Sequence, residues 1–370
     1  MRNRLYEQLH LVPALQKLHL GNASYGYTPE LFRKNFLSGL ADMTRLTHFS
    51  LHFDCFDELI EVLARNCAAT LLVLDMEWSQ KVTDACLPHL CLLLRLHQLH
   101  MFSCGLSGEG QAQVLRRLPR LVSLPRGDFL CEAVDWLDWS LDQEEEGSRV
   151  ELGVREFHYS EEYHFHTVAQ VEQVARLCPA ITHVRFMFGK EELGHYLHLQ
   201  HFARMTSLQV CGGDFYTDRL EGLLEVVGGR LEELDVYAVG EVDMKALAML
   251  TIYCSGLRSL SLRGCHFQAP EAASGEGRGG REVVEELLQP LPHLAHLRLT
   301  THGSCEYVET LVSKCRSLTH LELGRSVTIQ DSTIASILAS NTLDHLEHLH
   351  ISGGGSHPSK VHLLPRVGAP

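Results

Sequence analysis

Three leucines in one short segment constrain the fold of this chain more than any other feature. The segment Cys254–Cys265 reads CSGLRSLSLRGC, in which Leu257, Leu260 and Leu262 have the spacing L-x-x-L-x-L. This spacing predicts a short strand with the last two leucines on one face and the polar residues between them on the other. Burying three leucines contributes roughly 5 to 9 kcal/mol, whereas ordering about 25 residues costs tens of kcal/mol. One such unit is therefore stable only when neighbouring units stack on it.

The same spacing recurs along most of the chain, in about 13 candidate units. They start at Leu15, Leu46, Leu71, Leu96, Leu121, Val154, Ile181, Met205, Leu231, Leu257, Leu294, Leu318 and Leu346. Most intervals fall within the 20 to 29 residues that are typical of leucine-rich repeats. Three longer intervals predict insertions near residues 22–44, 128–150 and 266–282.

Helical patterns lie between the predicted strands. They cover residues 57–69, 171–178, 220–227, 244–254, 283–288, 307–315 and 332–340, and the first two insertions add helices at about 29–40 and 128–142. Units of one strand and one helix predict an α/β leucine-rich repeat solenoid over residues 1–352. Its parallel sheet would line a concave face and its helices a convex one. Residues 353–370, rich in glycine, are expected to form a flexible tail.

Composition excludes several classes of partner. A formal charge of −14 without a cluster of Lys or Arg argues against nucleic acid and against an anionic membrane. The first residues contain no apolar stretch typical of a signal peptide, so we expect a cytoplasmic chain, with the nucleus as an alternative. The 12 cysteines are expected to be reduced and mostly buried.

Several repeats resemble the cysteine-containing leucine-rich repeats of F-box/leucine-rich-repeat proteins. A cysteine precedes the strand at Cys67, Cys178, Cys254 and Cys315, and the segment VTDACL at 82–87 is similar to the family's helix entry, with Asp84 as the expected N-cap. The resemblance implies the substrate-recognition arm of an SCF-type ubiquitin ligase, in which a separate F-box binds Skp1. An F-box is not found here, because a repeat already begins at Leu15. Skp1 and cullin are therefore expected partners only if an F-box is supplied.

Sequence motifs for catalysis are absent, so we expect no enzyme and no cofactor. The 24 histidines are the unusual feature of the composition. His296, His320 and His348 occupy the same position in consecutive repeats and should form a ladder on the concave face, because neighbouring strands lie about 4.8 Å apart. Such a ladder could bind a metal or respond to pH. We expect a solvated polar face and assign no metal site.

The outward strand positions are the candidate binding surface, because parallel side chains on a rigid sheet are preorganised. The candidate partner-binding residues are Glu77, Trp78, His100, Phe102, His158, Arg185, Asp235, Tyr237, Arg263, Arg298, Glu322 and His350. Aromatic and Arg residues are common anchors of protein interfaces, and the mixed charges favour a protein target.

Three functions remain open from the sequence. The first is a protein-recognition module that acts as the substrate receptor of a ubiquitin ligase. The second is a stand-alone scaffold or inhibitor without a ligase role. The third is a metal- or pH-responsive binding protein that uses the histidine ladder. The role of Trp136 and Trp139 and the oligomeric state also remain open.

Overall fold

The structure is a computed structural model that describes residues 8–20, 30–124, 130–143, 151–160, 167–188, 196–240, 242–267, 288–303, 306–324, 337 and 343–351. The chain divides into two compact units. Unit 1 comprises Met1–Tyr159 and His166–Ile181, and unit 2 comprises Ser160–Phe165 and Thr182–Pro370. The single solenoid over 1–352 therefore stays a prediction. The expected tail at 353–370 and most of the insertion at 266–282 lie outside the described residues.

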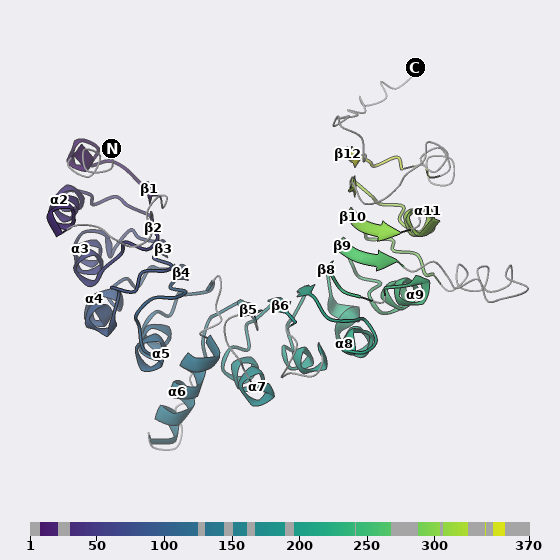
Figure 1. The fold of residues 1–370 in the computed structure, drawn as a ribbon, viewed down its shortest axis with the longest axis horizontal. Coiled ribbons are helices and arrows are strands. Elements are labelled where there is room, and N and C mark those ends of the chain that lie inside the picture. The colour runs from purple at the N-terminus through teal and green to yellow at the C-terminus, as the bar shows by residue number, and fades with distance from the viewer. Residues whose placement is uncertain are drawn as a thin grey trace, which may run out of the picture. The chain divides into compact units, whose positions relative to one another are not determined.

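Strands and helices alternate along unit 1. Its elements are η1 (Leu9–Leu11), β1 (Lys17–Leu20), α2 (Glu30–Leu40), β2 (His48–Leu51), α3 (Asp57–Cys67), β3 (Val73–Asp75), η2 (Asp84–Cys86), α4 (Leu87–Leu90), β4 (Gln98–His100), α5 (Gly108–Arg117), α6 (Leu130–Gln143), β5 (Glu156–Ser160) and α7 (Val168–Leu177). Strands β1 to β4 form a sheet in sequence order, and each neighbouring pair is parallel. Figure 1 shows α2, α3, α4 and α5 on one side of these strands.

Unit 2 repeats the same organisation. Its elements are β6 (His183–Met187), η4 (Tyr196–His201), β7 (Ser207–Cys211), α8 (Leu220–Val227), η5 (Gly228–Arg230), β8 (Glu233–Tyr237), α9 (Met244–Tyr253), β9 (Ser259–Phe267), β10 (His296–Gly303), α11 (Glu306–Ser313), β11 (His320–Leu323) and β12 (His348–Ile351). Strands β6 to β12 lie side by side in sequence order, again in parallel pairs. The fold is therefore the expected α/β leucine-rich repeat architecture.

The repeat spacing sets the strand register and thereby the core. Equivalent leucines pair across neighbouring strands, as in Leu234 with Leu260 and Leu260 with Leu297. These three side chains are each 1% exposed, and Leu262 is fully buried. Stacked leucines from successive strands thus form one continuous core under the helices of the unit. Helix α3 contributes its apolar side in the same way, with Leu59, Ile60 and Leu63 buried.

A left-handed backbone residue follows the same strand position in several repeats. In unit 1 these residues are Phe53, Trp78 and Ser103, and in unit 2 they are Gly212, Ala238 and Gly264. At Phe53, Trp78, Gly212 and Ala238 the amide donates to the next repeat, for example Trp78 N to Phe102 O at 2.8 Å and Ala238 N to Arg263 O at 2.7 Å. These hydrogen bonds hold Phe53, Trp78 and Ala238 in the left-handed conformation, which residues other than glycine rarely adopt.

One local detail differs from the sequence-based expectation. Thr83, not Asp84, is the N-cap of η2, because its hydroxyl accepts a hydrogen bond from the Ala85 amide. Asp84 instead accepts hydrogen bonds from the amide and hydroxyl of Ser107 in the following repeat.

Cysteines occupy buried positions in the core, as expected. Cys67, Cys178, Cys254 and Cys315 are buried, and none of them is in a disulfide. Burial raises the pKa of the Cys254 thiol to about 12, and it does the same for Cys178. Among the described residues, no helix has both the length and the apolar character needed to cross a membrane.

Candidate functional site on the open sheet face

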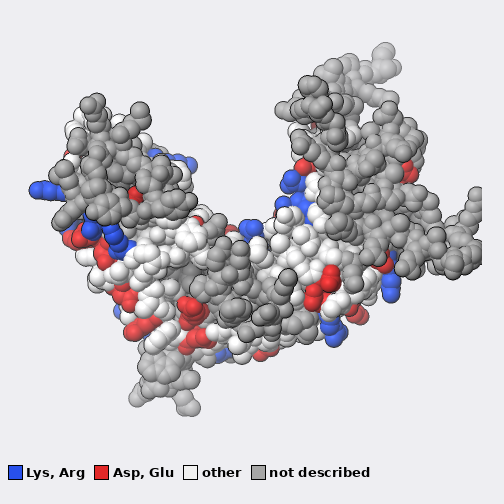
Figure 2. Space-filling model, in the orientation of Figure 1, with Lys and Arg blue, Asp and Glu red and all other residues white. Residues whose placement is uncertain are grey.

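The open face of each unit consists of the strand side chains that alternate with the buried leucines. In unit 2 this face contains a groove of about 510 Å³. Its polar lining consists of Ser207, Gln209, Glu233, Asp235, Ser259, Ser261, His296, Arg298, His320, Glu322, His348 and His350. These residues come from β7 to β12, and their alternation with leucines places them together. In Figure 2, acidic and basic side chains are interspersed over the described residues of the face shown.

An ion pair joins Asp235 of the groove lining to Arg263, which lies outside that lining. The Arg263 guanidinium donates from Nε to Asp235 Oδ1 at 3.0 Å and from Nη2 to Asp235 Oδ2 at 2.5 Å. Its Cζ also lies 5.0 Å from the centre of the Tyr237 ring. The hydrogen bonds to Asp235 raise the pKa of Arg263 above its usual value. A planar guanidinium that donates from both Nε and Nη2 to one carboxylate has a fixed orientation. Asp235 therefore fixes the Arg263 side chain beside the Tyr237 ring.

Further pairs connect neighbouring strands across the groove. Arg298 Nη2 lies 3.1 Å from Glu322 Oε1, and the Ser207 hydroxyl donates to Glu233 at 3.0 Å. Ser261 differs from these residues, since its Oγ is buried and has no hydrogen-bond partner among the described residues. A buried hydroxyl without a partner is costly. A group that enters the groove reaches this hydroxyl only after the side chain rotates.

The predicted histidine ladder is present at one end of the groove. His296 pairs in register with His320, and His320 with His348. Their ring centroids are 4.4 and 4.3 Å apart. Burial lowers the pKa of His320, and the neighbouring His296 and His348 lower it further. His320 therefore favours its neutral form.

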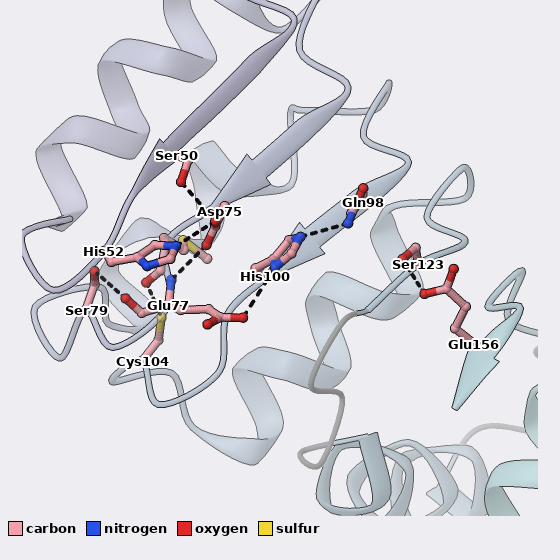
Figure 3. Close-up of polar contacts among 11 residues, drawn as sticks. Ser50, His52, Asp75, Glu77, Ser79, Gln98, His100, Cys104, Ser123 and Glu156 are labelled. Atoms are coloured by element: carbon pink, nitrogen blue, oxygen red, sulfur yellow. Dashed lines mark hydrogen bonds and ion pairs between the residues drawn. The ribbon is translucent and has the colours of Figure 1, made fainter. Parts of the chain in front are cut away.

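Unit 1 has a different polar cluster on its open face, formed by β2, β3, β4 and the residues that follow them (Figure 3). Asp75 Oδ2 accepts hydrogen bonds from the Ser50 hydroxyl at 2.9 Å and from His52 Nε2 at 2.7 Å. Burial alone would raise the pKa of Asp75. The hydrogen bond from His52, the nearby His100 and the hydrogen bond from Ser50 outweigh burial and leave this pKa below its usual value.

Glu77 and His100 complete the unit 1 cluster. His100 Nδ1 lies 3.3 Å from Glu77 Oε1, and His100 Nε2 lies 2.8 Å from Gln98 Nε2. The Glu77 side chain is only 9% exposed, and that of His100 is 19% exposed. Figure 3 shows the Glu77 carboxylate directed toward the His100 ring. The cluster thus brings two carboxylates and an imidazole together in a partly buried place.

Aromatic rings lie next to this cluster. Trp78 stacks on Phe53 with ring centroids 5.8 Å apart and planes inclined by 8°, and it meets the edge of Phe102 at 4.9 Å. Phe102 is 5% exposed. It therefore supports the Trp78 ring more than it offers its own surface to a partner.

The structure groups most of the predicted site residues into these two regions. Asp235, Tyr237 and Arg263 meet, as do Arg298 and Glu322, and His350 lies in register with Glu322. Glu77, Trp78, His100 and Phe102 belong to the unit 1 cluster and its aromatic neighbours. Arg185 on β6 and His158 on β5 do not line the unit 2 groove. Tyr237 and Arg263 do not line it either, but Arg263 is bound to Asp235, which does.

Sequence reasoning did not select His52, Asp75 or Ser261 as site residues. Asp75 ends β3 at an outward position, and His52 follows β2 with the same alternation, so strand parity was the available signal. No sequence signal shows that the Ser261 hydroxyl lacks a partner, because this depends on the side chains that surround it.

No protein-family model matches the chain, and no curated protein matches it either. Its fold is similar to that of an internalin, InlF, from Listeria monocytogenes, at 14% identity over 94% of this chain and 88% of that chain, with a TM-score of 0.40. It is also similar to the leucine-rich repeat-containing protein LegL7 from Legionella pneumophila, at 13% identity over 88% and 96% of the two chains, with a TM-score of 0.42.

A third similar structure is the complex of Rad7 and Elc1 in yeast, at 18% identity over 66% of this chain and 61% of that chain, with a TM-score of 0.37. The class of this protein follows from its own strands. Parallel pairing of strands in sequence order, with equivalent leucines in register, defines a leucine-rich repeat protein.

Proposed function

We propose that the chain is a protein-recognition module whose unit 2 groove binds a segment of a protein partner. The observation that carries the proposal is the groove itself, a hollow of about 510 Å³ on the open face of β7 to β12. A segment of a protein is a suitable ligand for this groove, because acidic, basic and neutral polar side chains lie close together in its lining. The Ser261 hydroxyl offers one further hydrogen bond to a backbone or side-chain group.

Preorganisation supports this proposal. Asp235 holds Arg263, and Arg263 in turn lies beside Tyr237, so these side chains lose little freedom when a partner binds. Tyr and Arg residues with fixed orientations are common hot spots of protein interfaces. The energetic centre of the interface would thus lie at Asp235, Tyr237 and Arg263.

We propose further that the module is the substrate-recognition arm of an SCF-type ubiquitin ligase. Support comes from the cysteine-containing repeats, in which the thiol of Cys67 donates to Met43 O at 2.9 Å and that of Cys104 to Met76 O at 3.1 Å. These two thiols link successive repeats. Skp1 and a cullin would join through an F-box supplied to this chain.

A stand-alone scaffold or inhibitor is the second candidate, since the groove requires no ligase to bind a partner. A metal- or pH-responsive role of the histidine ladder is the third. The stacked rings and the lowered pKa of His320 favour a response to pH over metal binding by the ladder. Equal heats of zinc binding for the wild type and for a variant with alanine at His296, His320 and His348 would exclude the ladder as a metal site.

Affinity purification from cells with mass spectrometry tests the proposed function. The test variant combines Asp235→Ala, Tyr237→Ala and Arg263→Ala. The control variant combines Glu232→Ala and Arg258→Ala, which removes an exposed ion pair from the same repeats outside the groove lining.

We expect a partner that is retained by the wild type and the control and lost by the groove variant. A partner that all three proteins retain equally would contradict binding in the groove. Skp1 and Cul1 with all three would support the ligase role. A groove-dependent partner without them, and with an unchanged half-life, would support the scaffold.

A further inference from the structure

Three residues of the unit 1 cluster bring metal-ligand atoms together, and none of them belongs to the lining of the unit 2 groove. One carboxylate oxygen of Asp75, one of Glu77 and one ring nitrogen of His100 all lie within 4.8 Å of one another. Asp75 and Glu77 share a face because they are two residues apart along the chain at the end of β3. His100 joins them because it pairs in register with Asp75 on the neighbouring strand β4.

We propose that Asp75, Glu77 and His100 bind one divalent transition-metal ion. Two carboxylate oxygens and one imidazole nitrogen combine the oxygen ligands that Mn²⁺ prefers with the nitrogen ligand that suits Zn²⁺. Three protein ligands leave further coordination positions open to water or to a group of a partner. The site is independent of the protein-binding function proposed for the unit 2 groove.

Charge and burial favour a cation at this place. The side chains of Asp75 and Glu77 are 14% and 9% exposed. Two carboxylates that converge in a partly buried place repel each other unless positive charge lies between them. A divalent ion bound between them would supply that charge.

The surroundings of the three ligands also suit a metal. Gln98 Nε2 lies 2.8 Å from His100 Nε2, and its amide can be turned so that the oxygen accepts the Nε2–H of the ring. This tautomer leaves the His100 Nδ1 lone pair directed toward the Glu77 carboxylate, and these two groups repel each other. A metal ion between them would turn this repulsion into two attractive contacts. Ser50 and His52 hold Asp75 in the same way, as outer partners of a ligand.

Titration of the untagged full chain with MnCl₂, followed by electron paramagnetic resonance of free Mn²⁺, is the direct test. Mn²⁺ is the first probe because thiolates prefer softer ions, so the cysteines interfere little. Isothermal titration calorimetry with ZnCl₂ then compares the two metals. We expect about one tightly bound Mn²⁺ per chain.

Variants grade the contribution of each residue. Asp75→Asn and His100→Gln should weaken Mn²⁺ binding by more than about 100-fold. His52→Gln should weaken it by about 10-fold, as expected for an outer partner. His97→Gln is the matched control, because His97 lies in the same repeat and is exposed, and its Nδ1 bonds to Arg95 O. This control should bind Mn²⁺ as the wild type does.

The wild type alone supplies a second measurement that does not depend on the folding of a variant. Mn²⁺ should slow hydrogen exchange in peptides covering β3 and β4, because the ion connects these two strands. No saturable Mn²⁺ binding, or binding that Asp75→Asn and His100→Gln leave unchanged, would overturn the proposal. Loss of the metal site would leave the partner of the unit 2 groove unaffected, so the two proposals fail separately.

Discussion

Exchanging glycine and alanine at the strand ends of unit 2 tests how the repeat backbone is built. Gly264 has φ of +62°, and Ala238 occupies the equivalent position one repeat earlier with φ of 51°. A methyl group at Gly264 would lie 3.5 Å from Tyr237 Cε2 and 3.6 Å from Ala238 N, which is ordinary van der Waals contact. The Gly264→Ala substitution therefore changes the backbone preference without a steric clash.

The expected magnitude follows from two opposing effects. The left-handed conformation costs an L-residue about 1 to 2 kcal/mol. Alanine also restricts the unfolded chain, which stabilises the folded state by about 0.4 to 1 kcal/mol. Gly264→Ala should thus lower the free energy of unfolding by about 1 kcal/mol, and Ala238→Gly should raise it by a similar amount. A change of about 1 kcal/mol corresponds to roughly a fivefold change in an opening equilibrium.

Hydrogen exchange with mass spectrometry is the suitable assay, because the three tryptophans of the chain, Trp78, Trp136 and Trp139, all belong to unit 1. Tryptophan fluorescence would therefore not report directly on unit 2. Peptides covering β8 and β9 should exchange about fivefold faster in Gly264→Ala and slower in Ala238→Gly, with peptides of unit 1 as the internal control. Unchanged exchange in both variants would refute the argument, and so would faster exchange in Ala238→Gly.

Three further predictions concern the core, the thiols and the histidine ladder. Leu234→Ala should destabilise unit 2 by about 2 to 5 kcal/mol in urea unfolding followed by circular dichroism, because the side chain is 1% exposed; a loss below about 1 kcal/mol would contradict its place in the core. Cys254, whose thiol pKa is raised to about 12, should react with iodoacetamide at pH 8 far more slowly in the folded chain than in urea, as mass spectrometry would show. His320 has a lowered pKa when folded, so its contribution to stability is complete above the unfolded value of 6.5 and is lost as the pH falls below it. The melting temperature should thus drop between pH 7.5 and 5.5, and less so in His320→Gln; an equal drop in both proteins would show that His320 is not responsible.

The sequence predicts the sheet because the repeat spacing determines the strand register. Residues at equivalent positions of successive repeats pair across neighbouring strands. Aligning L-x-x-L-x-L places His296, His320 and His348 at one position, and parallel pairing then brings the rings into a stack. The spacing does not predict the strand-end turns. Local preference favours glycine where Phe53 and Trp78 adopt positive φ, and hydrogen bonds between repeats override that preference.

The candidate sites are less predictable, since they depend on which neighbours each outward side chain meets. Strand parity indicates that Asp75 and Glu77 point outward, but it does not show that His100 approaches them closely enough to share an ion. Nor does parity distinguish Phe102, which is buried beside Trp78, from the exposed Tyr237. Rotamers and contacts between strands decide both cases.

The pairing of charges within the unit 2 groove determines how a partner can be recognised. Asp235 already binds Arg263, and Glu322 already binds Arg298, so a partner that brings its own charge must exchange one ion pair for another. Such an exchange changes the binding free energy little. A charge of the partner that faces a residue of the same sign is costly. Apolar contact with Tyr237 and a hydrogen bond to Ser261 require no exchange, because Tyr237 is 44% exposed and the Ser261 hydroxyl has no partner among the described residues. Affinity should therefore come mainly from contact with Tyr237, which lies against the Arg263 side chain that Asp235 holds, and the ion pairs should select among partners.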